Sequence, residues 1–187
     1  DRDNTLTLDP VNYFGRYDNW KDEFEFCPTV IEGLQKLTAD PNVKVIVASN
    51  QVGIAKGVLT HERVQDIHNH IDERLKEQGV FLDGFYFSPY ASERSRWRWF
   101  RRGYYHVYEY IDGASDMTKP NTWMLKQAAA DLGCSLEDFA QIYFIGDRKS
   151  DVKTGINAGG KGILVTNNAL EEQIAKIKRR LHRPGYA

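Results

Sequence analysis

The chain has 187 residues and a formal net charge of −1 at pH 7. This length suits one domain with a sizeable core, so we expect a single domain over residues 1–187. The nearly balanced charge gives no general attraction to nucleic acid or to anionic membranes. No apolar stretch approaches the ~20 residues needed to cross a bilayer, and two widely separated cysteines do not suggest a disulfide framework. These features favour a cytoplasmic protein, and they leave its oligomeric state open.

Two carboxylates open the sequence, in Asp1-Arg2-Asp3. Apolar residues at helical spacing then predict a helix over residues 28–37. The apolar run over residues 43–48 is rich in β-branched residues, so it predicts a buried strand. This strand leads directly into Ser49-Asn50-Gln51.

The rest of the chain continues the alternation of helices and strands. Thr60 can cap a long helix that ends near Gly79, residues 85–87 form a predicted strand, and Ser135 can start a short helix. Further helices are expected over residues 121–132, 151–158 and 170–181, and further strands over residues 142–145 and 162–165. Alternating strands and helices imply a parallel sheet that is covered by helices on both faces.

Four motifs in this order resemble those of the haloacid dehalogenase-like (HAD) superfamily of phosphotransferases. They are the pair Asp1 and Asp3, Ser49-Asn50, Lys119-Pro120, and Gly146-Asp147 through Asp151. Residues 49–57 are similar to T-N-Q-S-G-I-A-R-G of the histidinol-phosphate and heptose-bisphosphate phosphatase branch. Lys119-Pro120 with Met124-Leu125 matches its K-P-x-x-x-M-L. The resemblance covers roughly residues 1–165, and it implies an α/β, HAD-like (Rossmannoid) fold without a large cap domain.

The resemblance also implies a magnesium-dependent phosphomonoesterase, and the motif residues suit that chemistry. Asp1 can attack phosphorus and form an aspartyl-phosphate. Asp3 can protonate the leaving oxygen and then activate the water that cleaves the intermediate. Ser49, Asn50 and Lys119 are the expected phosphate-binding residues.

A metal site is expected beside these groups, because carboxylates next to a phosphate need a hard cation and Mg²⁺ prefers oxygen ligands. The expected ligands are Asp1, the backbone carbonyl of Asp3, and Asp147. Asp151 either supports this loop or binds the ion directly. Ligands of open α/β sheets bind at the carboxyl ends of the strands, so the motifs after residues 43–48 and 142–145 would face one crevice.

Three positions depart from the pattern of the resembled branch. Asn4 stands where a glycine is usual, and asparagine tolerates unusual turn geometry. Thr118 replaces an arginine before the lysine. A structural zinc site common in that branch needs cysteines that this region lacks, since the chain has only Cys27 and Cys134. In the resembled fold the nucleophile follows a central strand, so we expect such a strand upstream of Asp1.

A segment with interleaved arginines and aromatic residues lies within residues 90–112 and includes Arg98, Arg101 and Arg102. Period-two alternation predicts a hairpin with buried aromatics and exposed arginines. The same composition suits a substrate loop, because arginine binds phosphate bidentately and aromatics stack on sugars or bases. The two interpretations are compatible.

Three hypotheses for the function follow. The first is a phosphatase that acts on a small phosphorylated metabolite, such as a sugar or polyol phosphate. The second is a polynucleotide phosphatase, in which the arginine-rich segment grips a nucleic-acid end. The third is a non-catalytic binding module on the same fold, although no structural need explains Asp1, Asp3, Lys119 and Asp147 together.

Overall fold

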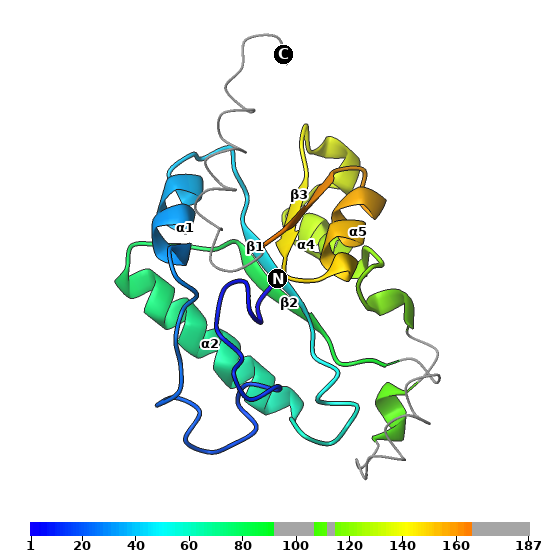
Figure 1. Cartoon of the computed structure of the whole chain (residues 1–187). Helices are drawn as coiled ribbons and strands as arrows, with labels where there is room; N and C mark the ends of the chain where they lie inside the picture. Colours follow the sequence, from blue (N-terminus) through cyan, green and yellow to red (C-terminus); the bar gives the residue numbers. More distant parts are fainter. Residues whose placement is uncertain (92–106, 112–114, 166–187) are drawn as a thin grey trace.

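The structure is a computed structural model that describes residues 1–91, 107–111 and 115–165. Figure 1 shows its helices and strands in space. In chain order they are α1 (Val30–Thr38), β1 (Ile46–Asn50), α2 (His61–Glu77), β2 (Gly84–Ser88), α4 (Trp123–Asp131), β3 (Tyr143–Gly146), α5 (Lys149–Asn157) and β4 (Lys161–Leu164). Short 3₁₀ helices cover Tyr108–Tyr110, Ser115–Met117 and Leu136–Asp138. The helix expected over residues 170–181 lies outside the described residues.

The strands pair in parallel, as the alternation of helices and strands predicts. β1 pairs with β2, and Ile46 lies opposite Gly84. β3 pairs with β4, and Tyr143 lies opposite Lys161. In the described part of the chain these are two separate parallel pairs. The predicted α/β class with parallel strands is confirmed.

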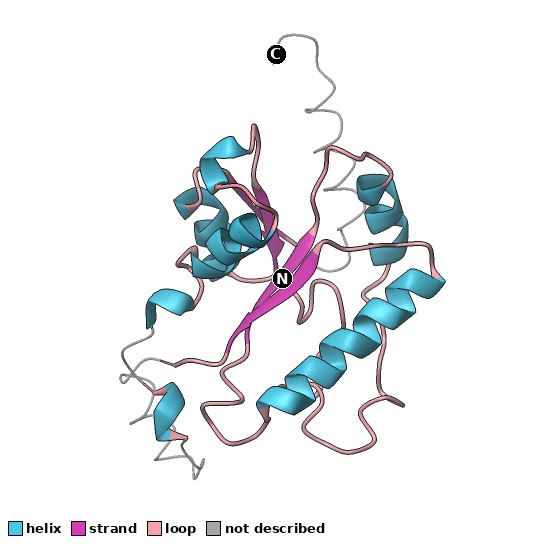
Figure 2. Cartoon of the chain, turned by 180° about the vertical axis from the view of Figure 1, so that it is seen from behind, coloured by secondary structure: helices cyan, strands magenta, loops and turns pink. Residues whose placement is uncertain are grey.

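Helices cover both faces of the strands. Alternate residues of a strand point to opposite faces, and β1 shows this directly. Val47 packs in a hydrophobic cluster with Val30 of α1 and Ile67 of α2, whereas Ala48 packs with Met124 of α4. Figures 1 and 2 show α1 and α2 on one side of the β1–β2 pair and α4 and α5 on the other.

Local contacts explain where the helices begin. The side chain of Thr60 accepts a hydrogen bond from the backbone nitrogen of Arg63 at 3.1 Å, so the predicted cap of α2 is confirmed. α1 begins at Val30 instead of residue 28, because Thr29 has a left-handed backbone (φ 60°) that cannot belong to an α-helix. α5 begins at Lys149, two residues earlier than expected, because the side chain of Asp151 caps it from within the first turn.

The strand predicted over residues 43–48 begins later, at Ile46. Asp83 explains the difference, because it occupies both backbone groups of Val45. Its Oδ2 accepts a hydrogen bond from the nitrogen of Val45 at 2.7 Å, and its own nitrogen donates to the carbonyl of Val45 at 2.8 Å. The ladder with β2 can start only after this contact.

A cavity of about 470 Å³ lies between the two parallel pairs. Its lining is mostly apolar and includes Leu34, Val47, Leu125 and Ile145. Such a wall does not suit a phosphate group, so this cavity is not the site that the motifs predict. The single domain over residues 1–187 stays a prediction.

No helix within the described residues is both long enough and apolar enough to span a bilayer. Cys27 and Cys134 are both free, and no disulfide joins them.

Candidate active site

Asp1 lies at the carboxyl end of β3 and is held there by the backbone. Its nitrogen donates a hydrogen bond to the carbonyl of Ile145 at 2.8 Å. Its Oδ1 accepts from the backbone nitrogen of Arg2 at 2.8 Å and from Nζ of Lys119 at 2.7 Å. Only 7% of the Asp1 side chain is exposed, so its carboxylate has a fixed place among other polar groups.

The loop after β3 brings two more carboxylates to Asp1. Asp151 is fully buried, and its Oδ2 accepts from the backbone nitrogen of Arg148 at 2.9 Å. Gly146 permits this arrangement, because a Cβ at position 146 would lie 2.4 Å from atoms of the Asp151 side chain. This contact lies within the loop after β3, and the choice between loop support and direct metal binding by Asp151 stays a prediction.

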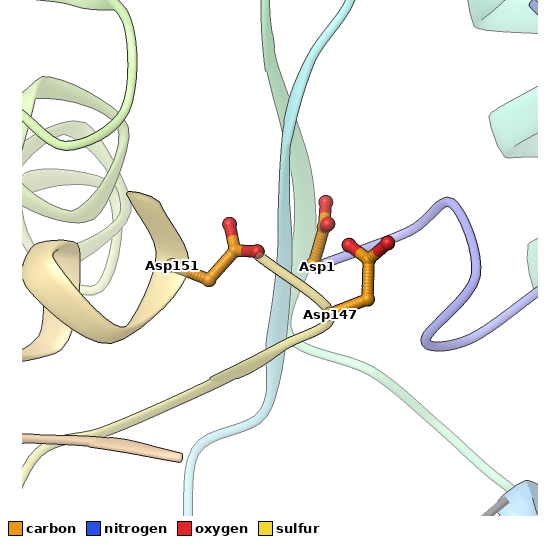
Figure 3. Close-up of side chains that lie close together, drawn as sticks. All are labelled: Asp1, Asp147 and Asp151. Carbon is orange, nitrogen blue, oxygen red and sulfur yellow. The ribbon is translucent and has the colours of Figure 1, made fainter. Parts of the chain in front are cut away.

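Asp1, Asp147 and Asp151 form a cluster of acidic oxygens. One oxygen from each lies within 4.8 Å of the others, and Figure 3 shows the three side chains close together. Burial raises the pKa of Asp147, Arg148 opposes this, and the nearby carboxylate of Asp151 raises that pKa further. Oδ1 of Asp147 is buried and accepts no hydrogen bond from the described residues. Nε of Arg148 lies 3.7 Å from this oxygen, which is an ion pair without a hydrogen bond. A buried carboxylate oxygen that accepts no hydrogen bond and lies among other hard oxygen donors fits a divalent cation such as Mg²⁺.

Lys119 supplies a positive charge to this cluster. Its Nζ lies 2.7 Å from Oδ1 of Asp1, 2.7 Å from Oδ1 of Asp151 and 3.2 Å from the carbonyl oxygen of Ala48. Burial lowers the pKa of Lys119, while the carboxylates of Asp151 and Asp3 oppose that shift. A buried ammonium ion among carboxylates is suited to holding the oxygens of a phosphoryl group.

Asn50 fixes the backbone of Lys119 to the end of β1. Its Oδ1 accepts from the nitrogen of Lys119 at 2.9 Å, and its Nδ2 donates to the carbonyl of Lys119 at 3.3 Å. Both ends of the Asn50 amide are therefore engaged by one residue. This contact positions the lysine, a task that the sequence motif alone does not reveal.

Asp3 lies in a hydrogen-bonded group with Arg2, Ser49 and Gln51. Its Oδ1 accepts from Nε of Arg2 at 2.9 Å, and its Oδ2 accepts from Nε2 of Gln51 at 2.8 Å. Burial alone would raise the pKa of Asp3, but the Arg2 guanidinium and the hydrogen bond from Gln51 outweigh it and hold that pKa below its ordinary value. Asn4 follows with φ 56°, a left-handed backbone geometry that asparagine tolerates.

A small pocket joins these groups. Its lining residues all come from the predicted motifs or their immediate neighbours: Asp1, Asp3, Ser49, Asn50, Lys119, Arg148, Ser150 and Asp151. Arg148 and Ser150 are additions to the predicted set, and their place between Asp147 and Asp151 is the signal that could have found them. Arg98, Arg101 and Arg102 lie outside the described residues, as does most of the segment over 90–112.

Comparison with known proteins places the chain among phosphatases. A family model described as HAD-hydrolase-like matches residues 116–185. The chain is 32% identical to D-glycero-D-manno-heptose-1,7-bisphosphate 7-phosphatase of Chlorobaculum tepidum over 94% of this chain and 81% of that protein. It is 34% identical to D-glycero-beta-D-manno-heptose-1,7-bisphosphate 7-phosphatase of Haemophilus influenzae, over 84% of this chain and 74% of that protein.

A solved structure shows the same fold. The crystal structure of D,D-heptose 1,7-bisphosphate phosphatase from B. bronchiseptica, complexed with magnesium and phosphate, has a TM-score of 0.66 and 22% identity, and the match covers 94% of this chain and 83% of that one. The chain therefore belongs to the HAD-like hydrolases, in the branch of the heptose-bisphosphate 7-phosphatases. It is a phosphoric monoester hydrolase of that family.

Proposed function

We propose that this protein hydrolyses the phosphate ester of a small phosphorylated sugar through a covalent intermediate on Asp1. The observation that carries the proposal is that Asp1, Asp3 and Lys119 line one small pocket, although Lys119 lies far along the chain from the other two. Asp147 joins Asp1 and Asp151 in the acidic cluster beside it. A nucleophile, a proton donor and charged groups for the phosphoryl oxygens are the components that ester cleavage needs.

In the first step, a carboxylate oxygen of Asp1 attacks phosphorus and the bond to the sugar oxygen breaks. Asp3 gives its proton to that oxygen, which leaves as an alcohol. Lys119 balances negative charge on the phosphoryl oxygens, and the hydroxyl of Ser49 donates a hydrogen bond to one of them. The phosphoryl group is then bonded to Asp1.

In the second step, Asp3 acts in the opposite direction. Now ionised, it takes a proton from a water molecule that attacks phosphorus, and the bond to Asp1 breaks to release phosphate. Arg2 and Gln51 favour the ionised form of Asp3, which suits this step. The first step needs the opposite form, so the substrate must bind while the carboxyl group of Asp3 is protonated.

Asp1, Asp147 and the backbone carbonyl of Asp3 are the proposed ligands of Mg²⁺, and the fully buried Asp151 supports the loop from behind. The bound ion supplies positive charge that offsets the repulsion between these carboxylates and a phosphate. Oδ1 of Asp147 is buried and accepts no hydrogen bond from the described residues, which supports this assignment.

The names of the relatives support the substrate class. Both curated relatives are 7-phosphatases of a heptose 1,7-bisphosphate, so a sugar phosphate with a primary alcohol as leaving group is the proposed substrate. The segment with Arg98, Arg101 and Arg102 is the proposed substrate loop, on the strength of its sequence alone.

The test is phosphate release from a panel that contains heptose bisphosphates, hexose phosphates, histidinol phosphate and a 3′-phosphorylated oligonucleotide. We expect release from a sugar phosphate in the presence of Mg²⁺, loss of release with a chelator, and recovery when Mg²⁺ is added back. Asp147→Asn should weaken the response to Mg²⁺, whereas Asp22→Asn, a change at an exposed carboxylate, should not. Preference for the oligonucleotide, or full activity without metal, would contradict the proposal.

A further inference from the structure

Gln51 lies between two residues of the proposed mechanism, Asp3 and Ser49. Its Nε2 donates hydrogen bonds to Oδ2 of Asp3 at 2.8 Å and to Oγ of Ser49 at 2.7 Å. The Gln51 residue is 3% exposed, and it is not among the residues that line the small pocket. Gln51 therefore contacts functional groups without facing the substrate.

Arg2 determines which way the Gln51 amide points. A guanidinium group only donates hydrogen bonds, and an ionised carboxylate only accepts them. With Oε1 toward Nη2 of Arg2, at 3.0 Å, and Nε2 toward Asp3, every contact joins a donor to an acceptor. The reversed amide would place donor against donor and acceptor against acceptor. Arg2 is itself fully buried, so this orientation is fixed from within the core.

The result for Asp3 is a carboxylate held at both oxygens. Arg2 donates from Nε to Oδ1 at 2.9 Å, and Gln51 donates to Oδ2. A group that transfers a proton must keep its oxygen within hydrogen-bond reach of the reacting atom. Two donors on two different oxygens fix the plane of the carboxylate as well as its distance.

The result for Ser49 is a hydroxyl whose hydrogen points away from Gln51. Its oxygen accepts one hydrogen bond from Gln51, which leaves its own hydrogen free to be donated elsewhere. Ser49 lines the pocket with Lys119 and Asp1. A phosphoryl oxygen in that pocket is an acceptor, so the orientation matches what the proposed substrate requires.

We propose that Gln51 is a positioning residue that, held by Arg2, orients Asp3 for proton transfer and Ser49 for phosphate binding. This inference rests on the proposed role of Asp3 as proton donor. It adds two residues, Arg2 and Gln51, that act on the reaction through their neighbours.

Two substrates whose leaving groups differ in basicity can distinguish a misplaced Asp3 from a general loss of structure. A sugar alcohol leaves only with a proton from Asp3, whereas p-nitrophenolate leaves without one. The value of kcat/KM depends on the steps up to the first irreversible one, which is cleavage of the bond to the leaving group. It therefore reports on Asp3 as proton donor in that step. The probes are p-nitrophenyl phosphate and the alkyl phosphate of the panel that the wild-type protein hydrolyses fastest.

The variant is Gln51→Met, which keeps the length and volume of the side chain and removes its hydrogen bonds. We expect kcat/KM for the alkyl phosphate to fall by ~10²-fold and that for p-nitrophenyl phosphate by less than about tenfold, since general acid catalysis typically contributes ~10²–10⁴-fold. Equal losses on both substrates, or no loss on either, would overturn the inference.

Gln51→Asn provides a second variant in case the first does not fold. It keeps an amide but is one methylene shorter, so it cannot reach Arg2, Asp3 and Ser49 together, and the same unequal loss is expected. Val64→Ala is the control, because Val64 is fully buried in a separate cluster with Ile54 and Leu59. This control should leave the ratio of the two kcat/KM values unchanged. If wild-type protein releases no phosphate from either probe, the proposed function fails instead.

Discussion

The ammonium group of Lys119 lies 2.7 Å from Oδ1 of Asp1, across 118 positions of the chain. It lies equally close to Oδ1 of the fully buried Asp151. One cation therefore serves two carboxylates that would otherwise repel each other, at the place where the proposed reaction brings a third anionic group. The stability and the activity of this site should both depend on that lysine.

Replacing Lys119 with methionine should reduce kcat/KM by ~10²–10³-fold, the usual loss when one group that stabilises transition-state charge is removed. The same change leaves two buried carboxylates without their cation, which costs about 3–5 kcal/mol in typical proteins. Steady-state kinetics and urea unfolding measure the two effects. The control is Lys126→Met, at an exposed lysine of α4. If Lys119→Met has the same kcat/KM as the wild type, the lysine has no role in the reaction.

Gly146→Ala should disturb the acidic cluster. An added Cβ would lie 2.4 Å from Cβ, Cγ and Oδ2 of Asp151, and this short side chain cannot move aside without its backbone. We expect lower thermal stability and weaker Mg²⁺ binding, measured by calorimetry. Gly79→Ala is the matched control, because its Cβ would meet nothing within 4 Å although its φ is 71°. Gly79→Ala should cost some stability through backbone strain alone, and its affinity for Mg²⁺ should equal that of the wild type.

His68 should make the protein sensitive to acid. Burial lowers its pKa from the ordinary 6.5 to about 3, and the positive charge of Arg2 adds to the shift. Between these two values the unfolded chain binds more protons than the folded one, so this group lowers the free energy of unfolding as the pH falls. The contribution is fully present above pH 6.5 and decreases by about 1.4 kcal/mol per pH unit below it.

The measurement is the free energy of unfolding against pH for wild type and His68→Phe. Phenylalanine keeps an aromatic ring beside Phe85 and Phe87, whose ring centroids lie 5.2 and 5.4 Å from that of His68. Below pH 6.5 we expect the slope of the variant to be smaller by about 1.4 kcal/mol per pH unit. Parallel curves would show that His68 is protonated equally in both states.

The arginine-rich segment yields a prediction from sequence alone. Replacing Arg98, Arg101 and Arg102 with alanine should raise KM for the sugar phosphate and leave the affinity for Mg²⁺ unchanged. The rate of the wild type should respond only mildly to salt, because a small substrate releases few counterions. Tight oligonucleotide binding that decreases steeply with salt, and that the triple substitution abolishes, would favour a polynucleotide substrate instead.

The sequence predicts which motifs lie close together, but it does not predict the individual contacts between their side chains. Ser49 and Asp147 each follow a predicted strand, and parallel strands place their carboxyl ends at one edge, so their proximity could be anticipated. The Asn50–Lys119 contact and the Arg2–Gln51 pair depend on side-chain directions, which the spacing of residues does not encode. β1 begins later than the sequence predicts for a similar reason, because Asp83 forms hydrogen bonds with the backbone of Val45 from a distant part of the chain.

The most direct test of the account is to find the phosphoryl group on Asp1. In Asp3→Asn the group that activates water is missing, whereas p-nitrophenolate leaves without a proton from Asp3. With p-nitrophenyl phosphate as the substrate, the covalent intermediate should therefore form faster than it is hydrolysed and accumulate during turnover. We would quench this variant with acid after mixing it with substrate and Mg²⁺, and examine its peptides by mass spectrometry. The account predicts one added phosphoryl group on the peptide that carries Asp1, absent from the double variant Asp1→Asn/Asp3→Asn. A phosphoryl group on another residue, or near-normal phosphate release by Asp1→Asn, would contradict it.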